Sequence, residues 1–413
     1  MSPQIETVAA ETARRLLSAE AVRERSHQLL AHGLADRLDH FTIALERLDG
    51  CAEEVVATIH AAYPSLDIPF HARWRHFAVG GVDRWGALAE AMPWPDEAAS
   101  ARAAFDLAIV SVLLDAGAGP DWRYEEGRTG ETYRRSEGLA VASFDMFVGG
   151  AFSSRPGDPF RVDAAALIEL TSDELGRGFQ VDPDNPLVGL EGRVALLNRL
   201  GHTVGASPEV FGQADAPRPG GLFDLLGKAE TVTAPAILTA LLAHLGPIWP
   251  GRIRLGGVDL GDTWRHPLAQ ADDPSDGLIP FHKLSQWLAY SLIEPLEAAG
   301  VTVTDVDGLT GLPEYRNGGL FLDSSVLRLR DPADAARPHE VESRLVVEWR
   351  ALTVALLDRM APLIRAKLGV EEAALPLAKV LEGGTWATGR RLARERRSDG
   401  APPLPVLSDG TVF

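Results

Sequence analysis

Segments whose apolar residues recur at helical spacing cover most of this 413-residue chain. A spacing of three and four residues places apolar side chains on one face of a helix, and that face must pack against other elements. The predicted helices end where proline, glycine or a capping residue interrupts the pattern. They are Glu11–His32, Leu34–Leu48, Ala52–Tyr63, Pro95–Gly117, Asp163–Arg177, Gly189–Leu200, Leu222–Lys228, Ala234–Leu245, Pro280–Ala299 and Ser343–Leu368.

Few segments have the composition of strands. Val301–Val306 is β-branched and follows a glycine, and Gly319–Leu329 and Arg252–Leu260 are the other two predicted strands. The expected fold class is therefore mainly α with a small β element (α+β).

The length of the chain exceeds the usual size of one compact core. Glycine and proline cluster at Ala214–Gly221, which is typical of a loop or a lobe boundary. We therefore expect an N-terminal helical lobe at 1–215 and a C-terminal helical lobe with the β element at 216–413, packed as one compact unit. The oligomeric state is left open.

Charge and composition exclude several classes of protein. With 40 basic and 58 acidic residues the net charge is −18, which argues against a protein that coats nucleic acid. A single cysteine, Cys51, excludes a disulfide framework within one chain. Met1–Glu11 has no signal-peptide pattern, and the apolar run Leu107–Leu114 is too short to cross a bilayer. We expect a cytoplasmic protein whose partner is a small molecule, without nucleic acid or membrane.

The common catalytic motifs are absent from the sequence. Gly221, Gly227 and Lys228 are similar to a phosphate-binding loop, but Ala229 stands where Ser or Thr would bind magnesium. His71 lies near another histidine, without a third ligand close in sequence. No metal and no organic cofactor is therefore expected.

The densest cluster of reactive polar side chains follows Pro313. A carboxylate, a phenol, a guanidinium and a carboxamide stand before two glycines, in the order Glu314, Tyr315, Arg316, Asn317, Gly318 and Gly319. Such a turn suits a site where backbone approaches a ligand. Glu314 could be a surface carboxylate, a partner of Arg316, or a catalytic acid or base. Asp323 could reach the same cleft if the intervening predicted strand folds back.

The helix predicted after Pro280 carries a second group of polar side chains. His282 and Gln286 share one of its faces, and Lys283 follows His282. If this face borders a cavity, the three side chains could hold phosphate or sugar hydroxyls. If it faces solvent, they are ordinary surface residues.

Further candidate ligand contacts lie in the first half of the chain. Arg73 and Arg75 flank a tryptophan, and His76 follows them. A guanidinium matches the geometry of phosphate or carboxylate, although these arginines could equally pair with surface acids. Asp121 follows a glycine-rich turn beside an aromatic residue, a combination that suits a base or sugar cleft.

Five segments together resemble the uracil catabolism protein family: Pro64–Arg84, Ser111–Glu126, Ser136–Ser153, Glu314–Asp323 and Ser408–Phe413. The resemblance extends over nearly the whole chain. It implies a place in a pathway that opens the pyrimidine ring of a uracil ribonucleotide and releases urea. A ribosyl-urea intermediate in that pathway would need cleavage between a urea nitrogen and the anomeric carbon.

Two segments, Phe281–Leu288 and Leu309–Asn317, are also similar to motifs of the queuosine-nucleotide glycosylase family. This similarity implies a helix-rich fold related to DNA glycosylases and cleavage of an N-glycosidic bond. That family has Asp-Tyr-Arg where this chain has Glu314, Tyr315 and Arg316, so the carboxylate arm is one methylene longer here.

The main hypothesis is therefore an N-glycosidase-type hydrolase. Glu314 would stabilise an oxocarbenium-like transition state and position water. Substrate would contact Tyr315, Arg316, Asn317, His282, Lys283 and Gln286, with Arg73, Arg75, His76 and Asp121 as further candidates. The rival hypotheses are a metal-dependent amidohydrolase or lyase of the same pathway, and a non-enzymatic pathway partner.

Overall fold

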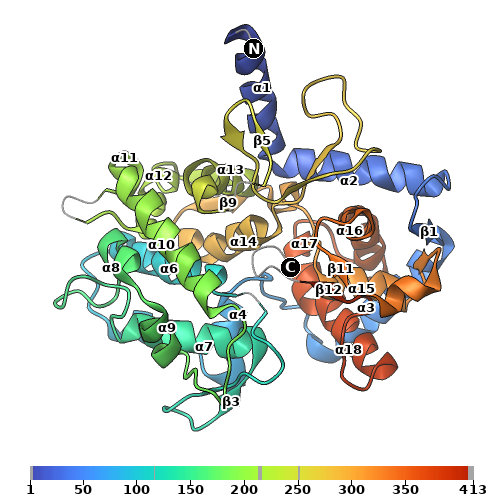
Figure 1. Cartoon of the computed structure of the whole chain (residues 1–413). Coiled ribbons are helices and arrows are strands. Elements are labelled where there is room, and N and C mark those ends of the chain that lie inside the picture. Colours follow the sequence, from blue (N-terminus) through green and yellow to red (C-terminus); the bar gives the residue numbers. More distant parts are fainter. Residues whose placement is uncertain (1–2, 116, 213–215, 250–251, 408–413) are drawn as a thin grey trace. The chain divides into compact units, whose positions relative to one another are not determined.

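The computed structural model describes residues 3–115, 117–212, 216–249 and 252–407. It is 57% helical, and its strands pair into small two-stranded sheets (Figure 1). This confirms the expected class, mainly α with a small β element. The segment Ser408–Phe413, which contributed to the family resemblance, lies outside the described residues.

The chain divides into two compact units, each built from separate stretches of sequence. Unit 1 comprises residues 1–71, 251–286 and 305–413, and unit 2 comprises residues 72–250 and 287–304. These boundaries differ from the division expected at residues 215 and 216. Spatial contacts can join stretches that are distant in sequence, whereas loop composition can only divide a chain into consecutive pieces.

Unit 1 is built around the long helix α16 (Arg344–Leu368), which packs against α2, α3 and α15. Ser343 caps its first turn by accepting a hydrogen bond from the Val346 N–H, and Gly369 ends it at φ 68°. The other helices are α1 (Pro3–Leu16), α2 (Ala19–Leu34), α3 (Leu48–Ala62), α15 (Tyr315–Asp323), α17 (Leu377–Val380) and α18 (Trp386–Arg396). The strands are β1 (Phe41–Ile43), β5 (Arg254–Leu255), β6 (Val258–Asp259), β7 (Thr263–Arg265), β8 (Leu278–Pro280), β10 (Leu327–Leu329), β11 (His339–Glu340) and β12 (Val406–Leu407).

Unit 2 is built around α6 (Glu97–Leu113), which packs against α7, α10 and α12. Nearly all of its residues from Ala101 onward are buried, so this helix forms the core of the unit. The other helices are α4 (Trp74–Phe77), α5 (Arg84–Ala91), α7 (Arg135–Val148), α8 (Ala164–Glu169), α9 (Ser172–Gly178), α10 (Leu190–Ala206), α11 (Pro208–Phe211), α12 (Leu222–Leu226) and α13 (Ala234–Leu245). The strands are β2 (Tyr124–Glu125), β3 (Thr132–Tyr133), β4 (Thr231–Thr233) and β9 (Thr302–Thr304), and α14 (Lys283–Ala298) begins in unit 1 and continues into unit 2.

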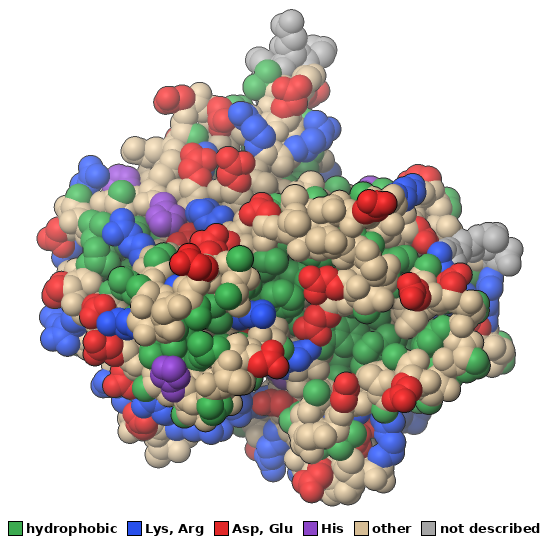
Figure 2. All heavy atoms as spheres, turned by 180° about the vertical axis from the view of Figure 1, so that it is seen from behind, with side chains coloured by type: hydrophobic (Ala, Val, Ile, Leu, Met, Phe, Trp, Pro, Cys, Tyr) green, Lys and Arg blue, Asp and Glu red, His purple; other side chains and the backbone are tan. Residues whose placement is uncertain are grey.

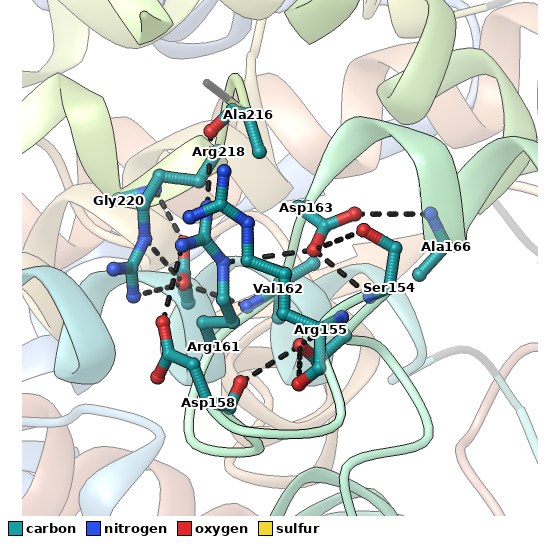
Figure 3. Close-up of polar contacts among 12 residues, drawn as sticks. Ser154, Arg155, Asp158, Arg161, Val162, Asp163, Ala166, Ala216, Arg218 and Gly220 are labelled. Atoms are coloured by element: carbon teal, nitrogen blue, oxygen red, sulfur yellow. Dashed lines mark hydrogen bonds and ion pairs between the residues drawn. The ribbon is translucent and has the colours of Figure 1, made fainter. Parts of the chain in front are cut away.

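A buried polar cluster fixes two loops of unit 2 to α6 (Figure 3). The carboxylate of Asp106, on α6, accepts hydrogen bonds from the N–H groups of Val162 and Gly220 at 2.7 and 2.5 Å. It also accepts two from the Arg218 guanidinium, at 2.9 and 2.5 Å. Because four protein donors bind the two oxygens of the buried Asp106 carboxylate, we assign this cluster a structural role.

Two of the element predictions are wrong. Leu34–Leu48 is not a helix, because it contains β1, whose Phe41 pairs with Leu329 of β10. Gly319–Leu329 is not a single strand, because its first five residues belong to α15 and only its last three residues form β10. The strand expected at Val301–Val306 is confirmed as β9, which pairs in parallel with β4.

The glycines of α15 explain the second error. A Cβ atom on Gly318 would lie 2.7 Å from the Trp349 ring of α16, so glycine allows the two helices to approach closely. Gly318 therefore permits helix packing, although in the sequence it has the appearance of a turn residue.

The surface carries charges of both signs. On the face drawn in Figure 2, Lys and Arg side chains are interspersed with Asp and Glu. None of the helices within the described residues is long and apolar enough to span a bilayer.

Candidate functional site

Glu314 occupies the N-cap position of α15 in unit 1. Its carboxylate oxygens accept hydrogen bonds from the backbone N–H groups of Arg316 and Asn317, at 2.7 and 2.5 Å. A carboxylate at this position satisfies two otherwise unpaired helix N–H groups and is stabilised by the helix dipole. The structure thus fixes the carboxylate rigidly, with lone pairs still available on each oxygen.

Burial and the neighbouring polar groups shift the pKa of Glu314 in opposite directions. Burial raises the pKa of its carboxyl group, and this effect prevails over the two backbone N–H groups that lower it. Electrostatic interactions with Lys283 and His71 also act to lower the pKa. A buried carboxyl with a raised pKa is a candidate for a group that takes up and releases protons during a reaction.

A histidine–carboxylate pair lies in the same unit. His71 Nδ1 is 2.7 Å from Glu382 Oε2, and the imidazole is almost fully buried. Glu382 belongs to a π-helical segment, Leu381–Thr385, at the start of α18. Such segments are rare and often occur at functional sites. His71 and Glu382 were not among the predicted site residues, although the glycines that follow Glu382 mark the irregular backbone.

A buried ion pair supports the loop before Glu314. The Arg350 guanidinium donates to both carboxylate oxygens of Asp262, at 2.8 and 2.7 Å, and its Nε donates to the Pro313 carbonyl at 3.4 Å. Burial acts to raise the pKa of Asp262, but the Arg350 charge and further donors outweigh it and lower this pKa to about 2. Asp262 is therefore a permanent anion, and the pair holds Pro313 in place.

The family of the chain follows from comparison with known proteins. A model of the family described as "Protein of unknown function (DUF1688)" matches residues 15–413. The chain belongs to this family. The "Protein urg3" of Schizosaccharomyces pombe is 40% identical over 413 residues, which cover 98% of this chain and 99% of that protein. "Uracil catabolism protein 4" of Lachancea kluyveri is 39% identical over 437 residues, covering 96% and 98%.

In this DUF1688 protein, two of the residues after Glu314 point into the protein. Asn317 is fully buried, and its amide accepts from Thr385 Oγ1 at 2.9 Å and donates to the Leu312 carbonyl at 3.2 Å. Arg316 donates to the Gly400 carbonyl at 3.0 Å, and its guanidinium lies 4.9 Å from the centre of the Tyr315 ring. These contacts join α15 to the segments around it.

The polar residues of the helix after Pro280 have different surroundings. Gln286 is fully buried, and its amide makes hydrogen bonds to Thr310 at 2.7 and 2.8 Å and to the Phe281 carbonyl at 3.0 Å. This residue therefore holds the loop that leads to Glu314. Lys283 donates its backbone N–H to Asp262 at 3.0 Å, and its ammonium acts on the Glu314 pKa.

His282 is buried, in the left-handed region at φ 48°, with its Nε2 2.9 Å from the Leu16 carbonyl. Burial lowers its pKa, so the imidazole is neutral in the folded protein. The unfolded imidazole takes up a proton as the pH falls below about 6.5, and the folded one does so only at lower pH. The free energy of unfolding should therefore decrease by at most about 2 kcal/mol between pH 6.5 and 5 because of this residue.

The substitution His282→Asn tests this pH dependence, because asparagine tolerates positive φ and does not titrate. Chemical denaturation at pH 7 and pH 5 should give a smaller loss of stability for the variant than for the original chain. Equal losses in the two proteins would show that His282 does not contribute.

Asp323 lies at the opposite end of α15 from Glu314. Nine residues of helix separate the two by about 13 Å at 1.5 Å per residue. The Asp323 carboxylate accepts two hydrogen bonds from the Arg397 guanidinium, at 2.8 and 2.6 Å. Because α15 is a helix and not a strand that folds back, Asp323 does not come close to Glu314.

The remaining predicted residues belong to unit 2. Arg73 is fully buried and donates to Ser111 Oγ at 2.8 Å, and its Nη2 has no hydrogen-bond partner within the described residues. Arg75 pairs with Glu294 at 2.5 Å. The His76 ring lies edge-on to Trp287, at 5.8 Å between centroids, and Asp121 is exposed.

Within the described ranges, no three His, Cys, Asp or Glu side chains are grouped so that they could hold a metal ion.

Proposed function

We propose that this chain acts in uracil breakdown and hydrolyses the N-glycosidic bond of a ribosyl-urea or ribosyl-urea phosphate. The name of one relative, "Uracil catabolism protein 4" of Lachancea kluyveri, supports the pathway. The observation that carries the reaction is the buried Glu314 carboxyl, held at a helix N-terminus with a raised pKa.

In this reaction water adds across the bond between the anomeric carbon and the urea nitrogen. The carbon–nitrogen bond breaks, the nitrogen takes a proton, and the products are a ribose or ribose phosphate and urea. The ring carbon gains positive charge as the bond breaks, which an adjacent carboxylate stabilises. Glu314 performs this role and accepts a proton from the attacking water, for which its raised pKa suits it.

Other polar groups of unit 1 can bind the parts of the substrate that do not contact Glu314. Lys283 supplies a positive charge for a phosphate or for the oxygen of the urea group. The pair formed by His71 and Glu382 offers a second proton-carrying group in the same unit. These residues form the proposed site together with Glu314.

The direct test is incubation of the purified chain with ribosyl-urea and, separately, with its 5-phosphate. Mass spectrometry should detect free urea together with ribose or ribose phosphate, at a rate unaffected by a chelator. Release of ribosylamine would instead indicate amide hydrolysis, and the absence of any product from either compound would contradict the proposal.

A further inference from the structure

Unit 2 contains a hollow that the proposed reaction does not use. Its volume is about 690 Å³, within the range of small-molecule sites, and residues of α4, α5, α6 and α14 line it. Three of the nine tryptophans of the chain, Trp74, Trp85 and Trp94, form part of its wall. We call this cavity, together with the residues that line it, the tryptophan pocket.

A proline in α14 explains the position of the first tryptophan. Pro295 has no N–H, so the carbonyl of Ser291, four residues earlier, loses its helical partner. The indole N–H of Trp74 donates to that carbonyl at 2.7 Å instead. The polar atom of Trp74 is therefore satisfied within the protein, and its ring is held firmly as part of the pocket wall.

The other two tryptophans continue this wall. The centroids of the Trp74 and Trp85 rings are 5.5 Å apart with planes tilted by 49°, and those of Trp85 and Trp94 are 6.4 Å apart with a tilt of 36°. The Trp94 indole N–H donates to the Ala89 carbonyl at 3.1 Å, which fixes this ring as well. The faces of such rings carry negative electrostatic potential and attract cations.

The charged residues of the pocket are predominantly acidic. Four carboxylates and one guanidinium line it, so its formal charge is −3. The guanidinium of Arg75 is paired with Glu294 at 2.5 Å. Asp83 and Asp96 each use one oxygen to cap a helix, at 2.9 and 2.7 Å. Glu97 forms no hydrogen bond or ion pair with the described residues through its carboxylate.

We propose that the tryptophan pocket binds a small organic cation with an apolar body, of the quaternary or protonated ammonium type. Indole faces and carboxylates both favour a cation, and the ring surfaces suit its apolar substituents. The same charge repels phosphates, so the pocket does not serve a ribosyl phosphate. This binding function is independent of the reaction proposed for Glu314.

The proposal is tested with choline and its uncharged analogue of the same shape, 3,3-dimethylbutan-1-ol. Calorimetric titration of the full chain should give saturable binding of choline that weakens at high salt. The neutral alcohol should bind at least about tenfold more weakly, because it lacks the cation–π and ionic attraction. Equal affinity for the two compounds, or no saturable binding of choline, would overturn the proposal.

Four substitutions, one of them a control outside the pocket, test whether choline binds there. Trp85→Leu should weaken choline binding at least about fivefold, whereas Trp85→Phe, which keeps an aromatic face, should retain most of it. Glu97→Gln should weaken binding several-fold, and Glu169→Gln, at an exposed carboxylate outside the pocket, should not change it. Thermal unfolding confirms that each variant is folded. Unchanged binding in Trp85→Leu would contradict the assignment.

Discussion

Glu314→Asn should strongly slow hydrolysis of the ribosyl-urea substrate while leaving the protein folded. Asparagine is among the best N-cap residues, so its side chain can still accept a hydrogen bond from the first turn of α15. It cannot stabilise positive charge as a carboxylate does, nor take a proton from water. We expect the turnover number to fall by at least about 100-fold, the range typical of a lost acid–base group. The rate of urea release measures this directly, and circular dichroism checks the fold.

Two control variants separate catalysis from helix capping. Glu314→Asp keeps both the cap and the charge but shortens the arm by one methylene, so it should retain part of the activity. Asp323→Asn alters the buried carboxylate at the other end of the same helix, which pairs with Arg397. It should lower stability without changing the turnover of the folded molecules. If the Glu314→Asn protein released urea at the original rate, Glu314 would have only a helix-capping role.

The sequence predicts the mainly helical class of this fold well. It does not predict the secondary structure of segments whose conformation depends on tertiary packing. Helices such as α16 follow from apolar periodicity, and the short strand β9 follows from β-branched residues. Gly318 misleads because its role, close approach to Trp349, exists only in the packed structure.

The candidate site shows the same limit. Glu314 stands out in the sequence because polar residues cluster around it. Asp262 and Arg350 are 88 residues apart, so no local pattern could indicate their ion pair. The sequence suggests Gln286 and Asn317 as ligand contacts. In the structure their carboxamides form hydrogen bonds with other protein groups and support the loop around Glu314. Which polar residues hold the backbone and which remain for a ligand is a property of the folded chain.

Arg350→Met should lower the free energy of unfolding by about 3–5 kcal/mol, because it leaves the Asp262 carboxylate buried without its cation. Methionine preserves much of the side-chain volume, so the decrease in the free energy of unfolding arises mainly from the loss of the positive charge. The loop that holds Pro313 would also lose a donor, and turnover at Glu314 should decrease as well. Urea denaturation at neutral pH measures the first effect.

The pH dependence of this loss identifies its cause. In the original chain the pKa of Asp262 is about 2, below its value in the unfolded chain, so its stabilising contribution is present above pH 4 and is lost as the pH falls toward 2. Without Arg350, burial dominates and raises this pKa above the unfolded value. The free energy of unfolding of the variant is then reduced most at high pH, where Asp262 is ionised. Protonation of Asp262 at lower pH restores part of this stability. The difference in stability between the two proteins should therefore narrow between pH 7.5 and pH 4.5.

The double variant Asp262→Asn/Arg350→Met provides the matched control. It removes both charges, so no ion remains buried without a partner, and it should recover most of the stability lost in Arg350→Met. Its difference from the original chain should also vary less with pH over the same range. If the double variant were as unstable as the single one, at every pH, the loss would arise from packing around Phe281, which the Arg350 guanidinium covers at 4.3 Å, and not from the unpaired carboxylate.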